Sequence, residues 1–162
     1  MKNLIKLPLV ALFTLLLFSC SKDSTSPALI GTGSYTFSGT TYQSFCIGVS
    51  ATLCNSGLDV TLSHQDNDPK GAVAIYNMPS ASSGTFSIVD GEKELDISLN
   101  PSLKSCKLFV ILSDLVMSDG YVSKSGTLTK TGPKSFTFTC SAIDLTTNQT
   151  KVITGKGTYI TP

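Results

Sequence analysis

The sequence predicts an all-β domain, an antiparallel β-sandwich or flattened barrel of about ten strands that form largely a meander. Three observations predict this fold. Apolar and polar residues alternate with a period of two, as over residues 58–63, which is typical of strands with one buried face. Turn residues such as Asp90-Gly91 separate these segments. No segment after residue 31 has the apolar spacing of an amphipathic helix.

The strands are expected between the turns, and short connections favour antiparallel pairing of consecutive strands. Ser118-Asp119-Gly120 and Gly132-Pro133 bound two of the later strands. The motif Gly-x-Gly-[Ser/Thr]-Tyr occurs at Gly31 and again at Gly155, so the first and last strands are expected to approach closely as neighbours in one sheet. The expected strands are 33–38, 41–49, 57–64, 70–77, 84–90, 93–99, 105–113, 120–130, 134–144 and 150–160.

The N-terminal residues predict export and lipidation. Lys2 and Lys6 precede an apolar run over Leu9–Phe18, which is too short for a bilayer-spanning helix of about 20 residues. The run ends in Leu-Phe-Ser-Cys, which resembles the lipobox of bacterial lipoproteins. The resemblance implies that residues 1–19 are a cleaved signal peptide and that Cys20 carries acyl chains. An ordinary secretory peptide with an incidental cysteine is the alternative.

Residues 20–30 are expected to form a flexible tether for one all-β domain over 31–162. Ser21-Lys22-Asp23 after the cysteine resembles the start of lipoproteins of the Bacteroidetes type. This resemblance implies an outer-membrane lipoprotein at the cell surface, and the periplasmic face is the alternative. The residues also suit a solvated linker. A flexible chain of ten residues has a span of about 17–19 Å, enough to hold the domain clear of the headgroups.

The rest of the chain also resembles small lipoproteins of the Bacteroidetes type. The similarity rests on the opening at Gly31, the stretch "GTLTKTGPKSFTFTC" and the closing "TGKGTYI". These are strand and turn patterns, and the resemblance implies an all-β fold without catalytic residues.

Four cysteines remain after Cys20, an even number that suits an oxidising compartment. Two disulfides can join them in three ways. Cys106 shares a strand face with Leu108 and Cys140 shares one with Phe138, so both thiols are expected to point inward. We therefore favour two bridges, Cys106 with Cys140 and Cys46 with Cys54. Zinc is disfavoured because no Cys-x2–4-Cys pair exists.

Composition excludes some partners. Charged residues are 14% of the chain and the formal net charge is +1, so no basic field that would recruit nucleic acid or anionic lipid is expected. All 12 basic residues are lysines, which removes the bidentate arginine grip on phosphate or carboxylate. Tryptophan is absent, which disfavours a site built on ring stacking.

The remaining candidates for chemistry are isolated polar side chains. His64 is the only histidine, and a triad with Ser63 and Asp66 would require sequence neighbours to converge in space. Asp66 and Asp68 resemble part of a calcium loop, but no glutamate closes it, and a polar turn explains both. Glu92, Glu94 and Asp96 are spaced by two residues and would share one face of a strand. They could serve as paired carboxylates for glycoside cleavage, or they could form the solvent-exposed face of a hairpin. We expect no catalytic, metal or cofactor site.

Three functional classes follow. The leading interpretation is a non-enzymatic envelope module, anchored to the membrane by lipid, that binds or scaffolds a protein or small molecule. The alternative is a carrier of a small apolar ligand inside a lipocalin-like barrel. An enzyme is least favoured because no nucleophile, base and orienting group can be named together. A filled interior would favour the module, whereas a continuous apolar cavity would favour the carrier.

Overall fold

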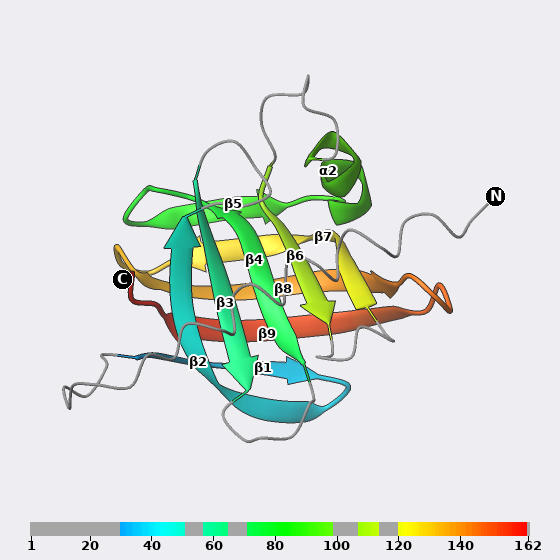
Figure 1. Ribbon diagram of the computed structural model, residues 1–162, viewed down its shortest axis with the longest axis horizontal. Coiled ribbons are helices and arrows are strands. Elements are labelled where there is room, and N and C mark those ends of the chain that lie inside the picture. Colours follow the sequence, from blue (N-terminus) through cyan, green and yellow to red (C-terminus); the bar gives the residue numbers. More distant parts are fainter. Residues whose placement is uncertain (1–29, 51–56, 65–70, 99–106, 114–119, 162) are drawn as a thin grey trace, which may run out of the picture.

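The computed structural model describes residues 30–50, 57–64, 71–98, 107–113 and 120–161. This part of the chain contains nine strands and one helix (Figure 1). The strands are β1 (Gly31–Phe37), β2 (Thr40–Ser50), β3 (Leu58–His64), β4 (Ala72–Met78), β5 (Gly84–Ile88), β6 (Phe109–Ser113), β7 (Gly120–Lys130), β8 (Ser135–Asp144) and β9 (Thr150–Thr158). The helix, α2 (Gly91–Ser98), lies between β5 and β6.

Eight of the strands form a closed antiparallel barrel. The order is β7-β6-β4-β3-β2-β1-β9-β8, and pairing of β8 with β7 closes the ring (Figure 1). β5 is the extra strand. One edge of β7 pairs with β6 along its N-terminal half and with β5 along its C-terminal half. Apart from this insertion, each strand pairs with the next along the chain. The predicted all-β meander is therefore confirmed, as a barrel.

Nine of the ten predicted strands are present with small shifts of their ends. The expected pairing of the first and last strands is confirmed, because β1 and β9 are antiparallel neighbours with Gly33 opposite Gly157. The two Gly-x-Gly motifs thus lie side by side in the sheet. Closure of the barrel removes open sheet edges around most of its wall, which protects the chain from edge-to-edge association.

The predicted strand over 93–99 is wrong, because residues 93–98 belong to α2. Its alternating charges also suit a helix of strong helix formers. Asp90 caps it: the N–H of Glu92 donates to Asp90 Oδ1 at 3.2 Å, and acidic residues in the first turn favour the helix dipole. Leu95 packs against the outer side of the barrel, beside Phe109.

Gly91 explains why the predicted Asp90-Gly91 hairpin does not form. A Cβ atom at Gly91 would lie 2.6 Å from Val122 Cγ1 and 3.0 Å from Phe109 Cδ2. Glycine therefore lets the first turn of α2 approach the wall formed by β6 and β7, rather than serving as a hairpin turn.

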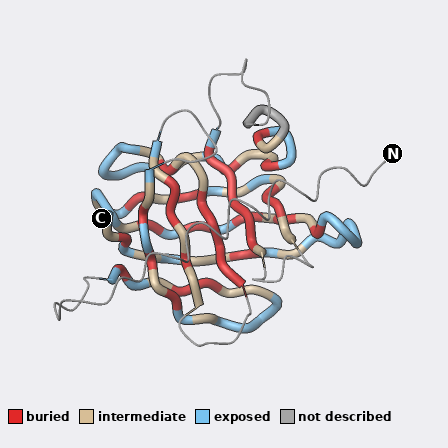
Figure 2. The backbone as a smooth tube through the Cα atoms, viewed as in Figure 1, coloured by how far each residue is buried: buried red, intermediate tan, exposed pale blue. Residues whose placement is uncertain are grey.

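The barrel interior is filled with side chains. Figure 2 shows buried positions along the strands and exposed residues gathered at the turns. One cluster of 18 buried residues, Tyr35 and Phe136 among the largest, runs through the interior. A smaller cluster of Phe109, Ile111 and Val122 lies outside the barrel, where α2 covers it. Apolar burial at both places stabilises the fold by about 25 cal/mol per Å² removed from water.

Candidate functional site

A β-bulge in β4 shapes one end of the barrel. The register between β3 and β4 shifts so that Tyr76 and Asn77 together oppose Asp59. Asn77 has a φ of 57°, a left-handed conformation that asparagine tolerates, and its N–H donates to buried Asp59 Oδ1 at 3.0 Å. Tyr76 consequently packs outside the barrel, where burial and the Asp59 carboxylate raise its pKa to about 12. Met78 packs into the interior.

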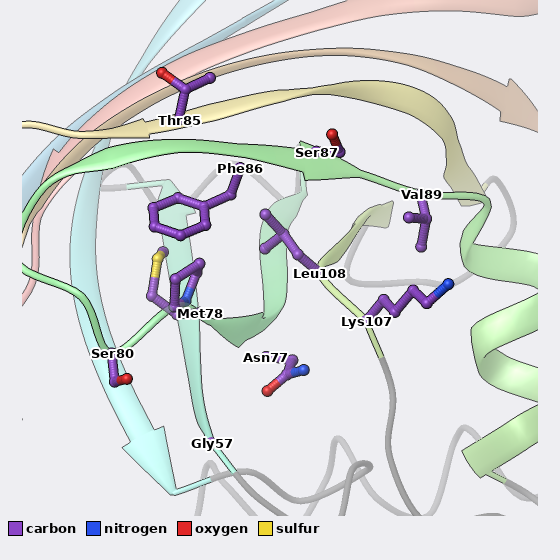
Figure 3. Close-up of a pocket in the computed structure, with 11 residues that line it drawn as sticks. Gly57, Asn77, Met78, Ser80, Thr85, Phe86, Ser87, Val89, Lys107 and Leu108 are labelled. Atoms are coloured by element: carbon purple, nitrogen blue, oxygen red, sulfur yellow. The ribbon is translucent and has the colours of Figure 1, made fainter.

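A pocket of about 920 Å³ lies beside this bulge, among β4, β5 and the residues that precede β6. Figure 3 shows Phe86 from β5, Met78 from β4 and Leu108 projecting toward one another, while the Lys107 side chain extends to one side. Asn77 lies at the edge of the same pocket. The pocket therefore combines a small apolar floor with a polar rim on which Lys107 is the charged lining residue.

Two hydrogen bonds hold the pocket wall that leads into β6. The N–H of Val89 donates to the carbonyl of Leu108 at 2.9 Å. The N–H of Lys107 donates to Oε2 of Glu94 at 2.7 Å, and this carboxylate is buried in α2. The Lys107 backbone is thus fixed to the helix, while its side chain is exposed. Such a preformed wall lowers the ordering entropy that ligand binding would cost.

A buried lysine closes the barrel beside the pocket. Lys130 has an exposed fraction of 2%. Its Nζ donates to the carbonyl oxygens of Pro79 at 3.3 Å and Pro133 at 2.8 Å, and to Oη of Tyr159 at 3.1 Å. Tyr159 Oη in turn donates to the Pro133 carbonyl at 3.0 Å. Lys130 and Tyr159 therefore form a plug in which neutral oxygens satisfy the ammonium.

The sequence offered one signal for the plug. Lys130 follows Leu128 by two residues on β7, so both share the inward face of the strand. Pro79 connects plug and pocket, because its carbonyl binds Lys130 while the residue lines the pocket. The pocket could not be predicted from hydrophobic periodicity, because its shape depends on the bulge at Asn77 and on the helix that replaces a predicted strand.

The expected inward position of Cys140 is confirmed. Cys46 and Cys140 are both buried in the interior as free thiols, and burial raises the pKa of each to about 12. Their predicted partners, Cys54 and Cys106, lie outside the described residues, as does Cys20. The proposed bridges and the lipidation therefore stay predictions.

His64 belongs to an aromatic group at the opposite end of the barrel. Its ring meets the Tyr42 ring edge-on at 5.3 Å, and Tyr42 stacks on Tyr35 at 5.0 Å. The Tyr35 hydroxyl donates to the carbonyl of Gly71 at 3.1 Å, and desolvation followed by the effect of Tyr42 raises its pKa to about 12. Ser63 is adjacent to His64 on β3 and so points to the other face. The structure does not bring these two side chains together.

Glu92, Glu94 and the capping residue Asp90 have structural partners. Glu92 and Asp90 pair with Lys124, and hydrogen bonding to Glu92 is the main cause of the raised pKa of that lysine. Glu94 points the other way, into the wall beside Lys107. The predicted common strand face of Glu92, Glu94 and Asp96 is therefore wrong, and the side chain of Asp96 lies outside the described residues, as do Asp66 and Asp68.

Comparisons with protein-family models, with curated proteins and with solved structures give no match to this chain. Within the described ranges, no group of three or more His, Cys, Asp or Glu side chains is placed to hold a metal ion. None of the helical residues in that part of the chain forms a segment long and apolar enough to cross a bilayer.

Proposed function

We propose that this chain is a membrane-anchored, non-enzymatic binding module whose ligand site is the pocket between β4, β5 and β6. The observation that carries the proposal is the combination of an apolar floor, Met78, Phe86 and Leu108, with the exposed amine of Lys107 at the rim. This arrangement suits a small ligand with an apolar body and an anionic group.

The barrel is compatible with a lipocalin-like binding module. Lipocalins bind ligands in the barrel interior, but here a continuous cluster of buried side chains occupies that space. The interior therefore favours binding at the end of the barrel over a carrier that encloses its ligand. Rigid strands around the pocket suit recognition without a large conformational change.

The anchoring part of the proposal rests on the N-terminal sequence. An acylated Cys20 would hold the domain at the outer membrane. One acyl chain gives only marginal, reversible binding, whereas several give a stable anchor, because each buried CH2 contributes about 0.8 kcal/mol. We expect Cys20→Ala to leave the domain folded and to move it from the detergent phase to the aqueous phase. Equal partitioning of mutant and wild type would refute the anchor and leave the pocket untouched.

The pocket is tested with 8-anilinonaphthalene-1-sulfonate, which has an apolar body and an anionic group. We expect saturable binding, detected as fluorescence enhancement, by the folded protein. Lys107→Gln should weaken binding about tenfold, the loss of one charged hydrogen bond of roughly 1.5 kcal/mol. Phe86→Ala should weaken it by a similar factor, because part of the apolar contact is lost.

Lys93→Gln is the matched control, since Lys93 is exposed on α2 and does not line the pocket. Its affinity for the probe should equal that of wild type. Thermal melts must show that all three variants are folded, because the probe also binds loosened proteins. Equal affinity of the wild type, Lys107→Gln and Phe86→Ala proteins would refute the pocket as the site.

A further inference from the structure

The barrel wall has a junction at the first residue of β1. Beyond this point the residues that follow β9 meet β2 directly: Gly48 N–H donates to the carbonyl of Ile160 at 2.8 Å, and Ile160 N–H donates to the carbonyl of Cys46 at 3.4 Å. Gly31 lies between them, and a Cβ atom there would lie 2.9 Å from Tyr159 Cα. The chain that precedes β1 therefore joins the barrel where β2 and the C-terminal residues meet, at the left of Figure 1.

Three isoleucines lie at this junction, and we call them the isoleucine cluster: Ile30, Ile47 and Ile160. Ile30 directly precedes the crowded Gly31 and is 45% exposed, and Ile47 is 39% exposed. Ile160 bridges to Ile47 and is half-buried. Single exposed apolar side chains are common on protein surfaces, whereas a group of neighbouring exposed apolar side chains indicates a contact surface.

The described charged residues nearest the isoleucine cluster are lysines, although the net charge of the whole chain is only +1. Lys134 adjoins it, since its carbonyl accepts from the N–H of Tyr159 at 3.1 Å and its Nζ reaches Thr161 Oγ1 at 3.5 Å. Lys156 is exposed four residues before Ile160. The described carboxylates are buried or lie at α2 and in the β8–β9 turn: Asp59, Asp90, Glu92, Glu94 and Asp144.

The position of the tether indicates what covers this surface. Ile30 lies ten positions after Cys20, and a flexible chain of that length has a span of about 17–19 Å. An acyl anchor at Cys20 would therefore keep the isoleucine cluster near the headgroups. Because the tether raises the effective concentration of the surface at the bilayer, even a weak contact would be populated.

We infer that the isoleucine cluster docks on the anionic surface of the bilayer that holds the anchor. The isoleucines enter the headgroup boundary, and Lys134 and Lys156 face anionic headgroups. This inference rests on the proposed anchor. Docking would fix the orientation of the barrel on the membrane instead of leaving the domain free on its tether.

The absence of tryptophan makes the orientation measurable. Ile47→Trp introduces a single tryptophan in the isoleucine cluster, and Val152→Trp introduces one at a control position on β9. Val152 is a large apolar residue with a higher exposed fraction, 60%, and lies eight residues before Ile160, about 26 Å along an extended strand. Both lipidated proteins are reconstituted in vesicles of phosphatidylethanolamine and phosphatidylglycerol, with and without brominated phospholipid.

Brominated lipid should lower the emission of Ile47→Trp about twofold, because an interfacial side chain reaches roughly 5–10 Å into the headgroup boundary. The emission of Val152→Trp should not change. Phosphatidylcholine in place of both lipids should weaken the quenching, and equal quenching in both vesicle types would overturn the assignment of an anionic surface.

Flotation of the vesicles separates the two proposals. If the protein floats but Ile47→Trp is quenched no more than Val152→Trp, the docking inference is overturned and the anchor is retained. Protein that does not float overturns both. An emission of Ile47→Trp that is blue-shifted but insensitive to brominated lipid would show a second protein molecule on the isoleucine cluster, and would also overturn membrane docking.

Discussion

Replacing Lys130 with methionine tests the plug that closes the barrel beside the pocket. Methionine retains much of the length of lysine but removes the three hydrogen bonds from Nζ. The Pro133 carbonyl keeps the hydrogen bond from the Tyr159 hydroxyl, whereas the Pro79 carbonyl and the Tyr159 oxygen lose their donor. Each buried acceptor without a partner costs about 1–3 kcal/mol.

Removal of the charge opposes this loss, because a buried ammonium carries a desolvation penalty that methionine does not. We therefore expect a net decrease of about 2 kcal/mol in the free energy of unfolding for Lys130→Met. Lys130→Ala should lose roughly a further 1–2 kcal/mol, because it also leaves a cavity. The effect is a substantial part of a typical stability of about 5–15 kcal/mol.

Urea unfolding followed by circular dichroism measures the effect. With a slope of about 2 kcal/mol per molar urea, Lys130→Met should lower the midpoint by roughly 1 M. Lys156→Met is the control: it replaces an exposed lysine on the outer face of β9, and should change stability by less than about 0.5 kcal/mol. A midpoint for Lys130→Met equal to or above that of wild type would refute the argument that the hydrogen bonds of the ammonium stabilise the plug.

Three other predictions concern the helix, the thiols and one carboxylate. Gly91→Ala should lower the free energy of unfolding by about 1–3 kcal/mol through overpacking. Gly120→Ala is the control, because a Cβ atom there would meet nothing within 4 Å, and it should be near neutral in the same urea assay. Similar losses for both variants would contradict the packing argument. In the reduced, folded protein, iodoacetamide at pH 8 should leave Cys46 and Cys140 unmodified, because burial raises the pKa of both thiols to about 12; rapid native alkylation, detected by mass spectrometry, would disprove this. Backbone N–H donors lower the pKa of Asp144 below its ordinary value of 3.8. The stabilisation from the charged carboxylate is therefore present above pH 3.8 and is lost as the pH falls through the lower pKa of the folded state. Asp144→Ala should lower the free energy of unfolding more at pH 7 than at pH 2, and an equal loss at both would contradict the linkage.

The strands could be predicted because one face of each is buried. Leu128, Phe136 and Phe138 all face the interior, and the same alternation correctly placed Cys140 there. Consecutive strands separated by short turns then pair in the only order that a meander allows. The repeated Gly-x-Gly motif also indicated the pairing of β1 with β9 that the closed ring requires, whereas the pairing of β5 with β7, which breaks the chain order, could not be predicted in this way.

The helix and the pocket were missed because both depend on specific contacts that hydrophobic periodicity does not report. A short segment with charges two residues apart fits a strand or a helix, and the outcome depended on the cap at Asp90 and on the close approach at Gly91. The pocket depends on a bulge at Asn77, whose left-handed backbone is held by Asp59 on the neighbouring strand. Such a long-range contact leaves no mark in hydrophobic periodicity.

The predicted disulfides have a direct test of their own. Mass spectrometry of the unreduced, digested protein should find Cys106 linked to Cys140 and Cys46 linked to Cys54. In the chain-entropy model the longer loop contributes roughly 3–4 kcal/mol and the shorter loop less. A link between Cys46 and Cys140, or four free thiols after oxidative export, would show that the predicted pairing is wrong.

The most direct test of a ligand site at this end of the barrel is a map of amide chemical shifts during titration with 8-anilinonaphthalene-1-sulfonate. The pocket account predicts that the largest changes fall on Asn77, Phe86 and Leu108, while Thr139 on the outer wall and Tyr42 at the opposite end stay constant. Saturable binding whose largest changes fall at Thr139 or Tyr42, with the pocket residues unchanged, would contradict the account.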